Sequence, residues 1–101
     1  MTYFIQTFDR PGVEAQRAAL RMEHLRYLDD TKHQLLACGA KLDEESSAPI
    51  GGVYLVDVKT REEAEAYIAG DPFTKANLFR EIQIEQWRKA FFDRQRFVEL
   101  G

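Results

Sequence analysis

A short stretch, Gly70-Asp71-Pro72-Phe73, places a carboxylate where a new helix is expected to begin. Gly70 is expected to end the preceding helix in the left-handed conformation, which glycine adopts at little cost. Asp71 can then cap the next helix, and Pro72 suits the first helical position because it has no N–H group to leave unpaired. From this stretch alone, a plain helix cap at a terminus that favours negative charge is the preferred interpretation.

His24 is predicted to lie on the flank of a helix together with two arginines. Spacings of four, three and four residues place these side chains along one flank: Arg17, Arg21, His24 and Leu28. Histidine exchanges a proton near neutral pH and therefore suits general acid–base chemistry. The residues alone, however, favour a half-buried histidine bonded to solvent or to a backbone carbonyl. Arg21 could bind a carboxylate, enolate or phenolate oxygen, or it could simply be solvated.

Other residues that could carry chemistry give weaker signals. His33 falls in a turn, and two histidines without a further cluster do not make a metal site, so we expect no metal. Cys38 lies in an apolar strand and is interpreted as an inert core thiol. Tyr54 and Trp87 could line a pocket for a flat ring, although such residues more often belong to the core. No phosphate loop, Cys-x-x-Cys motif or nucleophile elbow is present, and we expect no cofactor.

The composition predicts one globular domain, residues 1–101. A net charge of −3 offers no basic excess for phosphates, so we expect no nucleic-acid partner. No apolar run approaches the roughly 18 residues that cross a membrane, and the N-terminus lacks the features of a signal peptide. The single cysteine cannot form an internal disulfide, which favours the cytoplasm.

Hydrophobic periodicity predicts four strands and three helical segments. The strands are expected over 2–8, 34–42, 53–58 and 81–87, and the helices over 13–30, 61–69 and 72–79. The first helix should bury a stripe formed by Ala15, Ala18, Met22 and Leu25. Thr60 and Glu63 form a capping box for the second helix. The order β-α-β-β-α-β predicts an α+β, ferredoxin-like fold with an antiparallel four-stranded sheet and both helices on one face.

Both faces of the strand over 53–58 are apolar. Val53 and Leu55 lie on one face, and Tyr54, Val56 and Val58 lie on the other. Because the helices cover only one face of the sheet, the other face needs a partner, and a second copy of the chain is the simplest. We therefore expect a homodimer closed sheet against sheet, with higher assembly left open. The sequence does not indicate which set of side chains faces the partner.

Several short motifs, in this order and spacing, resemble the YciI-like (YCII-related) family, a branch of the dimeric α+β barrel superfamily. They are Arg21-x-x-His24-Leu25, Leu36-x-x-Gly39, Pro49-Ile50-Gly51-Gly52, Thr60 to Ala64, Asp71-Pro72-Phe73 and Trp87. The resemblance covers most of the chain and implies a small pocket between the helices and the sheet. It also implies that His24 and Asp71 are an active-site pair, in which Asp71 holds the imidazole ring and His24 moves a proton.

Two classes of function remain open. The first is a cofactor-independent enzyme that transfers a proton on a small organic substrate, by isomerisation, elimination or lactone chemistry. Its candidate substrate contacts are Arg21, Gly39, Phe73 and Trp87. The second is a non-catalytic ligand-binding or regulatory dimer that keeps the same pocket. The sequence departs from the family in a C-terminal extension over 91–101, whose five apolar residues predict that it packs on the dimer.

Overall fold

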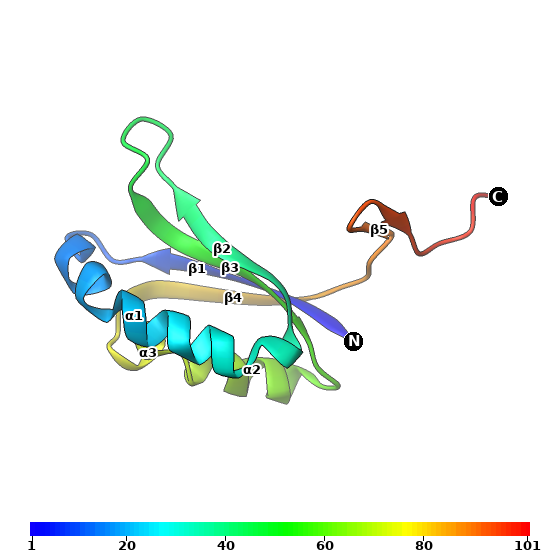
Figure 1. The fold of residues 1–101 in the computed structure, drawn as a ribbon, viewed down its shortest axis with the longest axis horizontal. Helices are drawn as coiled ribbons and strands as arrows, with labels where there is room; N and C mark the ends of the chain where they lie inside the picture. Colours follow the sequence, from blue (N-terminus) through cyan, green and yellow to red (C-terminus); the bar gives the residue numbers. More distant parts are fainter.

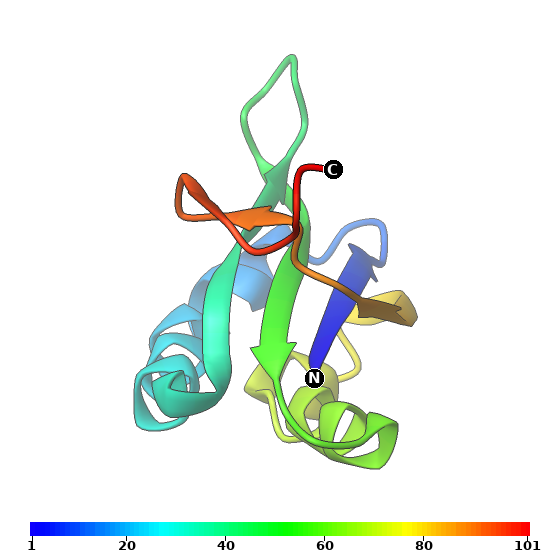
Figure 2. The same cartoon turned by 90° about the vertical axis from the view of Figure 1, so that its right-hand side faces the viewer.

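The computed structural model describes all 101 residues, and four antiparallel strands form its main sheet (Figure 1). The strands are β1 (Thr2–Asp9), β2 (Leu35–Leu42), β3 (Pro49–Asp57) and β4 (Phe79–Trp87), in the order β2-β3-β1-β4. The helices are α1 (Glu14–Asp30), α2 (Arg61–Ala69) and α3 (Pro72–Lys75), with a 3₁₀ turn over Lys32–Gln34. All of them cover one face of the sheet (Figures 1 and 2), which confirms the predicted ferredoxin-like arrangement. No helix is both long and apolar enough to cross a membrane.

Alternate residues of the two central strands form the core against the helices. Tyr3 pairs with Val56 and Ile5 pairs with Tyr54, and all four side chains are buried. α2 adds its own buried residues, Ala64, Tyr67 and Ile68, to this cluster. The structure therefore selects between the two sets of β3 side chains. Tyr54, Val56 and the following Val58 face the helices, and the alternate residues Val53 and Leu55 face away from them.

The face of α1 that packs on the sheet differs from the predicted one. All four residues of the predicted stripe are exposed, and Met22 has a relative solvent exposure of 57%. The half-buried positions are instead Val13, Arg17, Leu20, His24, Tyr27 and Leu28. Both sets follow helical spacing, and the prediction chose the more apolar one. The inner face therefore includes two polar side chains among apolar ones, and α1 directs Arg17 and His24 towards the sheet.

Gly70 ends α2, but not in the left-handed conformation that was predicted. Its φ is −80° and its ψ is −14°, which any residue can adopt. A Cβ atom added here would lie 2.6 Å from the hydroxyl oxygen of Tyr27. Glycine therefore suits this position, because a larger residue would displace the Tyr27 side chain of α1, which packs against the end of α2. The predicted caps do form, since Thr60 accepts a hydrogen bond from the N–H of Glu63 and Asp71 accepts one from the N–H of Phe73.

Gly51 marks a close approach between strands and gives a stability prediction. A Cβ atom added to it would overlap the backbone carbonyl oxygen of Thr7 on β1, whereas one added to Gly39 on β2 would meet no atom within 4 Å. We expect Gly51→Ala to lower the free energy of unfolding by about 1–3 kcal/mol, because the backbone must shift. The control Gly39→Ala should change it by less than about 0.5 kcal/mol. Urea unfolding of both variants at one protein concentration tests this, and equal losses would contradict it.

Beyond Trp87 the chain leaves the sheet and forms a small hairpin of its own (Figure 1). The hairpin consists of β5 (Phe91–Phe92) and β6 (Gln95–Arg96). The Lys89 ammonium lies 5.7 and 4.6 Å from the ring centroids of Phe92 and Phe97, and no hydrogen bond joins the hairpin to the sheet or the helices. The radius of gyration is 14.5 Å, against about 13 Å for a compact chain of this length. The predicted packing of this tail on a dimer stays a prediction.

Candidate active site

His24 on α1 and Asp71 at the start of α3 lie side by side, although 47 positions separate them in the sequence. The Nδ1 atom of His24 is 2.9 Å from both carboxylate oxygens of Asp71. The Asp71 side chain is fully buried, while that of His24 is 13% exposed. The Nε2 atom of His24 makes no hydrogen bond within the chain. The pair therefore leaves one ring nitrogen available to a molecule in the adjoining cavity.

Two further donors fix the Asp71 carboxylate in place. The hydroxyl of Tyr54 donates to Oδ2 at 2.8 Å, and the backbone N–H of Phe73 donates to Oδ1 at 2.9 Å. Burial, with the nearby charge of Asp71, raises the pKa of Tyr54 far above its ordinary value. Tyr54 therefore keeps its proton and acts as a donor to the carboxylate. A carboxylate with three donors around it has little freedom to rotate away from His24.

Phe73 supports the imidazole ring from the protein side. Its ring stacks on that of His24, with centroids 4.1 Å apart and an interplanar angle of 15°. The guanidinium carbon of Arg17 also lies 4.7 Å from the Phe73 ring centroid. Because Phe73 is fully buried, its prediction as a substrate contact is wrong for this structure. It positions His24 and Arg17 instead.

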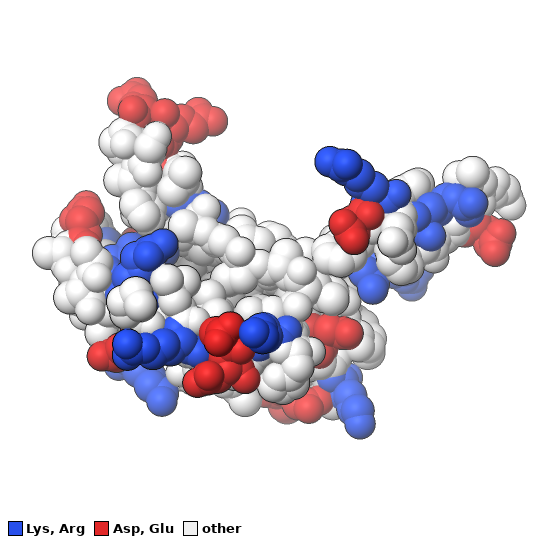
Figure 3. Space-filling view, viewed as in Figure 1, with Lys and Arg blue, Asp and Glu red and all other residues white.

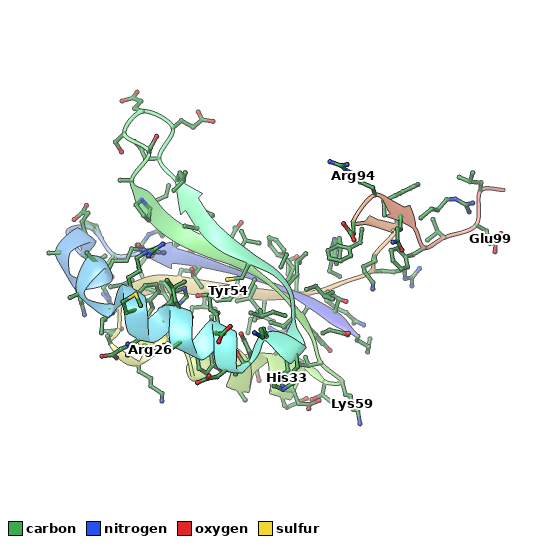
Figure 4. All side chains as sticks on the ribbon, in the orientation of Figure 1. Arg26, His33, Tyr54, Lys59, Arg94 and Glu99 are labelled. Carbon is green, nitrogen blue, oxygen red and sulfur yellow. The ribbon has the colours of Figure 1, made fainter.

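A cavity of about 210 Å³ lies between α1 and the β2–β3 edge of the sheet. Tyr54, which lines it, lies between the sheet and the helical layer (Figure 4). The lining residues are Arg17, Arg21, His24, Leu25, Leu28, Cys38, Gly39, Ala40, Gly52 and Tyr54. An apolar cavity of about 150 Å³ is enough to hold benzene. The space therefore suits a single ring with small substituents.

The two arginines that line the cavity differ in their freedom. Arg17 is anchored, because its Nε donates to Asp9 at 2.8 Å and its Nη2 donates to the carbonyl of Gly51 at 3.0 Å. Arg21 makes no hydrogen bond or ion pair within the chain. Arg17 is thus fixed in an ion pair with Asp9, and Arg21 is free to bind an anionic oxygen.

The structure brings together most, but not all, of the predicted site. Arg21 and Gly39 line the cavity beside His24. Trp87 does not, because it ends β4 at the opposite edge of the sheet from β2 and borders a separate shallow groove. His33 lies in the 3₁₀ turn that follows α1 (Figure 4). No group of three or more His, Cys, Asp or Glu side chains is placed to hold a metal ion.

Two residues absent from the predicted site belong to it on geometric grounds. Arg17 shares the spacing of Arg21 and His24, and that spacing was the signal that could have included it. The sequence indicates Tyr54 only as a possible wall of a pocket, and its bond to Asp71 could not be predicted because that bond depends on which face of β3 it occupies. The prediction that Cys38 belongs to the core is wrong, because this residue is exposed and lines the cavity.

Cys38 is expected to react slowly despite its exposure. Partial burial, together with the charge of Asp71, raises the pKa of its thiol to about 12, and Arg17 only partly opposes this. Against an ordinary pKa of about 8.5, the thiolate fraction at pH 8 falls roughly a thousandfold. We therefore expect iodoacetamide to alkylate native Cys38 at pH 8 at least about a hundredfold more slowly than the urea-unfolded chain. Similar rates in the two states would contradict this environment for Cys38.

Comparison with known proteins identifies the family and one informative relative. The model of the YCII-related domain matches residues 1–88. The structure is similar to that of 5-chloro-2-hydroxyhydroquinone dehydrochlorinase from Burkholderia phenoliruptrix AC1100 in complex with 2,5-dihydroxybenzoquinone. The TM-score is 0.82 at 28% identity, over 87% of this chain and 94% of that chain.

Two further solved structures show weaker similarity. A protein from Arabidopsis thaliana has a TM-score of 0.49 at 12% sequence identity, and the alignment covers 98% of both chains. An antibiotic biosynthesis monooxygenase has a TM-score of 0.47 at 13% sequence identity, and the alignment covers 87% of this chain and 98% of that chain. No curated protein matches the chain. Since the domain model spans 88 of the 101 residues, the chain belongs to the YCII-related domain family.

Proposed function

We propose that this chain is a cofactor-independent enzyme in which His24 and Asp71 move a proton on a small hydroxylated ring. The observation that carries the proposal is the imidazole itself, held at Nδ1 by a buried carboxylate and unbonded at Nε2. The cavity beside it has room for one ring. The similar dehydrochlorinase, which is bound to a dihydroxybenzoquinone, supports a ring of this class as the substrate.

The proposed chemistry begins with His24 as the base. Nε2 takes a proton from a ring hydroxyl, and Asp71 stabilises the imidazolium that forms. Arg21, unpaired in the chain, receives the resulting oxyanion. Return of the proton to a ring carbon completes an isomerisation. Where that carbon bears a leaving group X, loss of a proton from a second ring hydroxyl expels X as an anion. The ring therefore loses one molecule of HX and becomes a quinone, and the reaction needs no external oxidant.

The test uses 5-chloro-2-hydroxyhydroquinone, the compound in the name of the similar dehydrochlorinase. Chloride release should accompany quinone formation in a one-to-one ratio, and 2,5-dihydroxybenzoquinone should inhibit competitively. The alternative is a non-catalytic ligand-binding dimer. Binding of 2,5-dihydroxybenzoquinone that survives His24→Ala, with no turnover of any hydroxylated ring in a panel, would select that alternative.

We also propose that the chain works as a homodimer through the face of the sheet that the helices leave bare. Phe4, Val53 and Leu55 point to this face and are only half-buried. β4 adds polar side chains at one edge, since Glu81, Gln83 and Glu85 point the same way. An apolar strip with a polar border is the usual composition of a protein–protein interface.

Paired substitutions on β3 test this interface. We expect Leu55→Asp to give a folded monomer by light scattering, because it places a charge in the centre of the bare face. Val56→Asp should instead unfold the chain, because Val56 is fully buried under the helices. A stable, soluble monomer of the parent chain, or a Leu55→Asp variant that remains a dimer, would contradict the proposed interface.

A further inference from the structure

The C-terminal tail, residues 88–101, exposes apolar side chains that nothing in its own chain covers. Phe91 is 61% exposed, Phe97 48% and Leu100 74%. Its few hydrogen bonds and cation–aromatic contacts stay within the tail. The family model matches residues 1–88, so all of the tail after Arg88 lies beyond the matched region. Exposed apolar groups gathered in one short segment indicate a docking surface.

The tail also carries charge opposite to that of the remaining chain. It has four basic residues, Arg88, Lys89, Arg94 and Arg96, against two acidic ones, Asp93 and Glu99. The net charge of the tail is therefore +2 in a chain whose net charge is −3, so residues 1–87 carry −5. Electrostatic complementarity of this kind selects the region on which a segment docks.

The matching acidic site is the turn between β2 and β3. It carries Asp43, Glu44 and Glu45 in succession, with no basic residue between them. Hydrogen bonds from Ser46 lower the pKa of Asp43 below its usual value, which keeps that carboxylate charged. Figure 3 shows the tip of this turn in red and, at the other end of the molecule, a tail with more blue than red among its white atoms.

The turn and the tail stand on the same side of the sheet. Figures 1 and 2 show both on the side opposite the helices, at the two ends of the bare face. The molecule is 49 Å long, and no hydrogen bond or ion pair joins its tail to its own turn. Two bare faces can pack together about a two-fold axis that lies in the interface, at right angles to the long axis of the molecule. The tail end of one copy then lies over the turn end of the other. Each tail then reaches the turn of the other copy.

We propose that the tail crosses to a second copy of the chain and docks its basic hairpin on the acidic β2–β3 turn of that copy. The proposal rests on the proposed dimer but not on the proposed chemistry. In a two-fold dimer the contact occurs twice, once at each end. The turn joins β2 and β3, the two strands that supply Gly39, Ala40 and Gly52 to the cavity lining. Docking of the tail on the turn would thus help to hold β2 and β3 in the positions that shape the cavity.

A charge-exchange experiment on the full-length chain tests the contact. One variant reverses the tail (Arg94→Glu with Arg96→Glu), and the other reverses the turn (Glu44→Lys with Glu45→Lys). Each variant alone faces like charges across both contacts, so its dimer Kd at 50 mM salt should rise about tenfold or more in sedimentation analysis. Mixed in equal amounts, the two variants pair opposite charges at both contacts, and the mixed dimer should return to within about threefold of the parent Kd. The effect should shrink at 0.5 M salt.

The controls separate this contact from its alternatives. Glu23→Lys with Glu62→Lys makes the same charge change on exposed helical positions and should leave the Kd unchanged. Recovery in the mixture requires contact between copies, because a tail docked on its own turn gives no recovery on mixing. A mixture no tighter than the separate variants, or variants that dimerise like the parent, would overturn the proposal. All readouts are association constants, so they are independent of whether the chain turns over any substrate.

Discussion

Replacing His24 with alanine should lower the turnover of a hydroxylated ring by about 10²- to 10⁴-fold, the usual effect of losing a general acid or base. Nε2 of His24 is the only proton acceptor in the cavity whose orientation a buried carboxylate fixes. The loss should appear mainly in kcat, since Arg21 and the cavity walls that hold the ring remain. Chloride release from 5-chloro-2-hydroxyhydroquinone, measured over a range of concentrations, separates kcat from KM.

The chain supplies its own matched control for this prediction. His33 is the second of its two histidines and lies in the turn after α1, away from the cavity lining. His33→Ala should therefore keep the parent rate, and melting curves should show both variants folded. If His24→Ala turns the substrate over at the parent rate, His24 is not the base, and the proposed chemistry fails whatever the structure of the pair.

Asp71→Ala should lower the free energy of unfolding by about 3–5 kcal/mol, the range for removing one partner of a buried charged group. The change deprives His24, the Tyr54 hydroxyl and the Phe73 N–H of their common acceptor, and it removes the cap of α3. Asp71→Asn should cost less, because asparagine still caps a helix but lacks the charge. Tyr54→Phe removes only one of the three donors and should cost about 1 kcal/mol. Urea unfolding gives all three values.

An exposed carboxylate provides the reference for that series. Asp29 forms an ion pair with Lys32 at 3.0 Å, and its side chain is 71% exposed. Asp29→Ala should change the free energy of unfolding by less than about 1 kcal/mol, as exposed ion pairs do. If Asp71→Ala were as mild as Asp29→Ala, the carboxylate would not be the common anchor of the site.

The sequence was sufficient to predict the order of the elements and the cap at Asp71. Both depend on local chemistry, since Pro72 and Asp71 favour a helix start wherever they stand. β-branched and aromatic residues mark β1 as a strand, and alternation marks β4. The proximity of His24 and Asp71 was predicted from the family resemblance and from a topology that puts both helices on one face. Spacing along the chain could not supply it, because the contact joins residues 47 positions apart.

What the sequence could not supply depends on packing between distant elements. Two stripes of α1 have the same helical spacing, and only the sheet decides that His24, rather than Met22, faces inward. Gly70 is fixed by the approach of Tyr27 from another helix, which no local pattern reveals. Phe73 was expected beside a substrate, but stacking on His24 places it beneath the imidazole.

The ¹⁵N NMR spectrum of the His24 imidazole tests the central claim most directly. In a His33→Ala background His24 is the only histidine, so both ring signals belong to it. Because Asp71 accepts a hydrogen bond at Nδ1, the neutral ring should carry its proton on Nδ1, and Nε2 should resonate as an unprotonated nitrogen. Addition of 2,5-dihydroxybenzoquinone should then shift the Nε2 signal most. A proton on Nε2 of the neutral ring, or signals that saturating ligand leaves unchanged, would contradict His24 as the base that faces the bound ring.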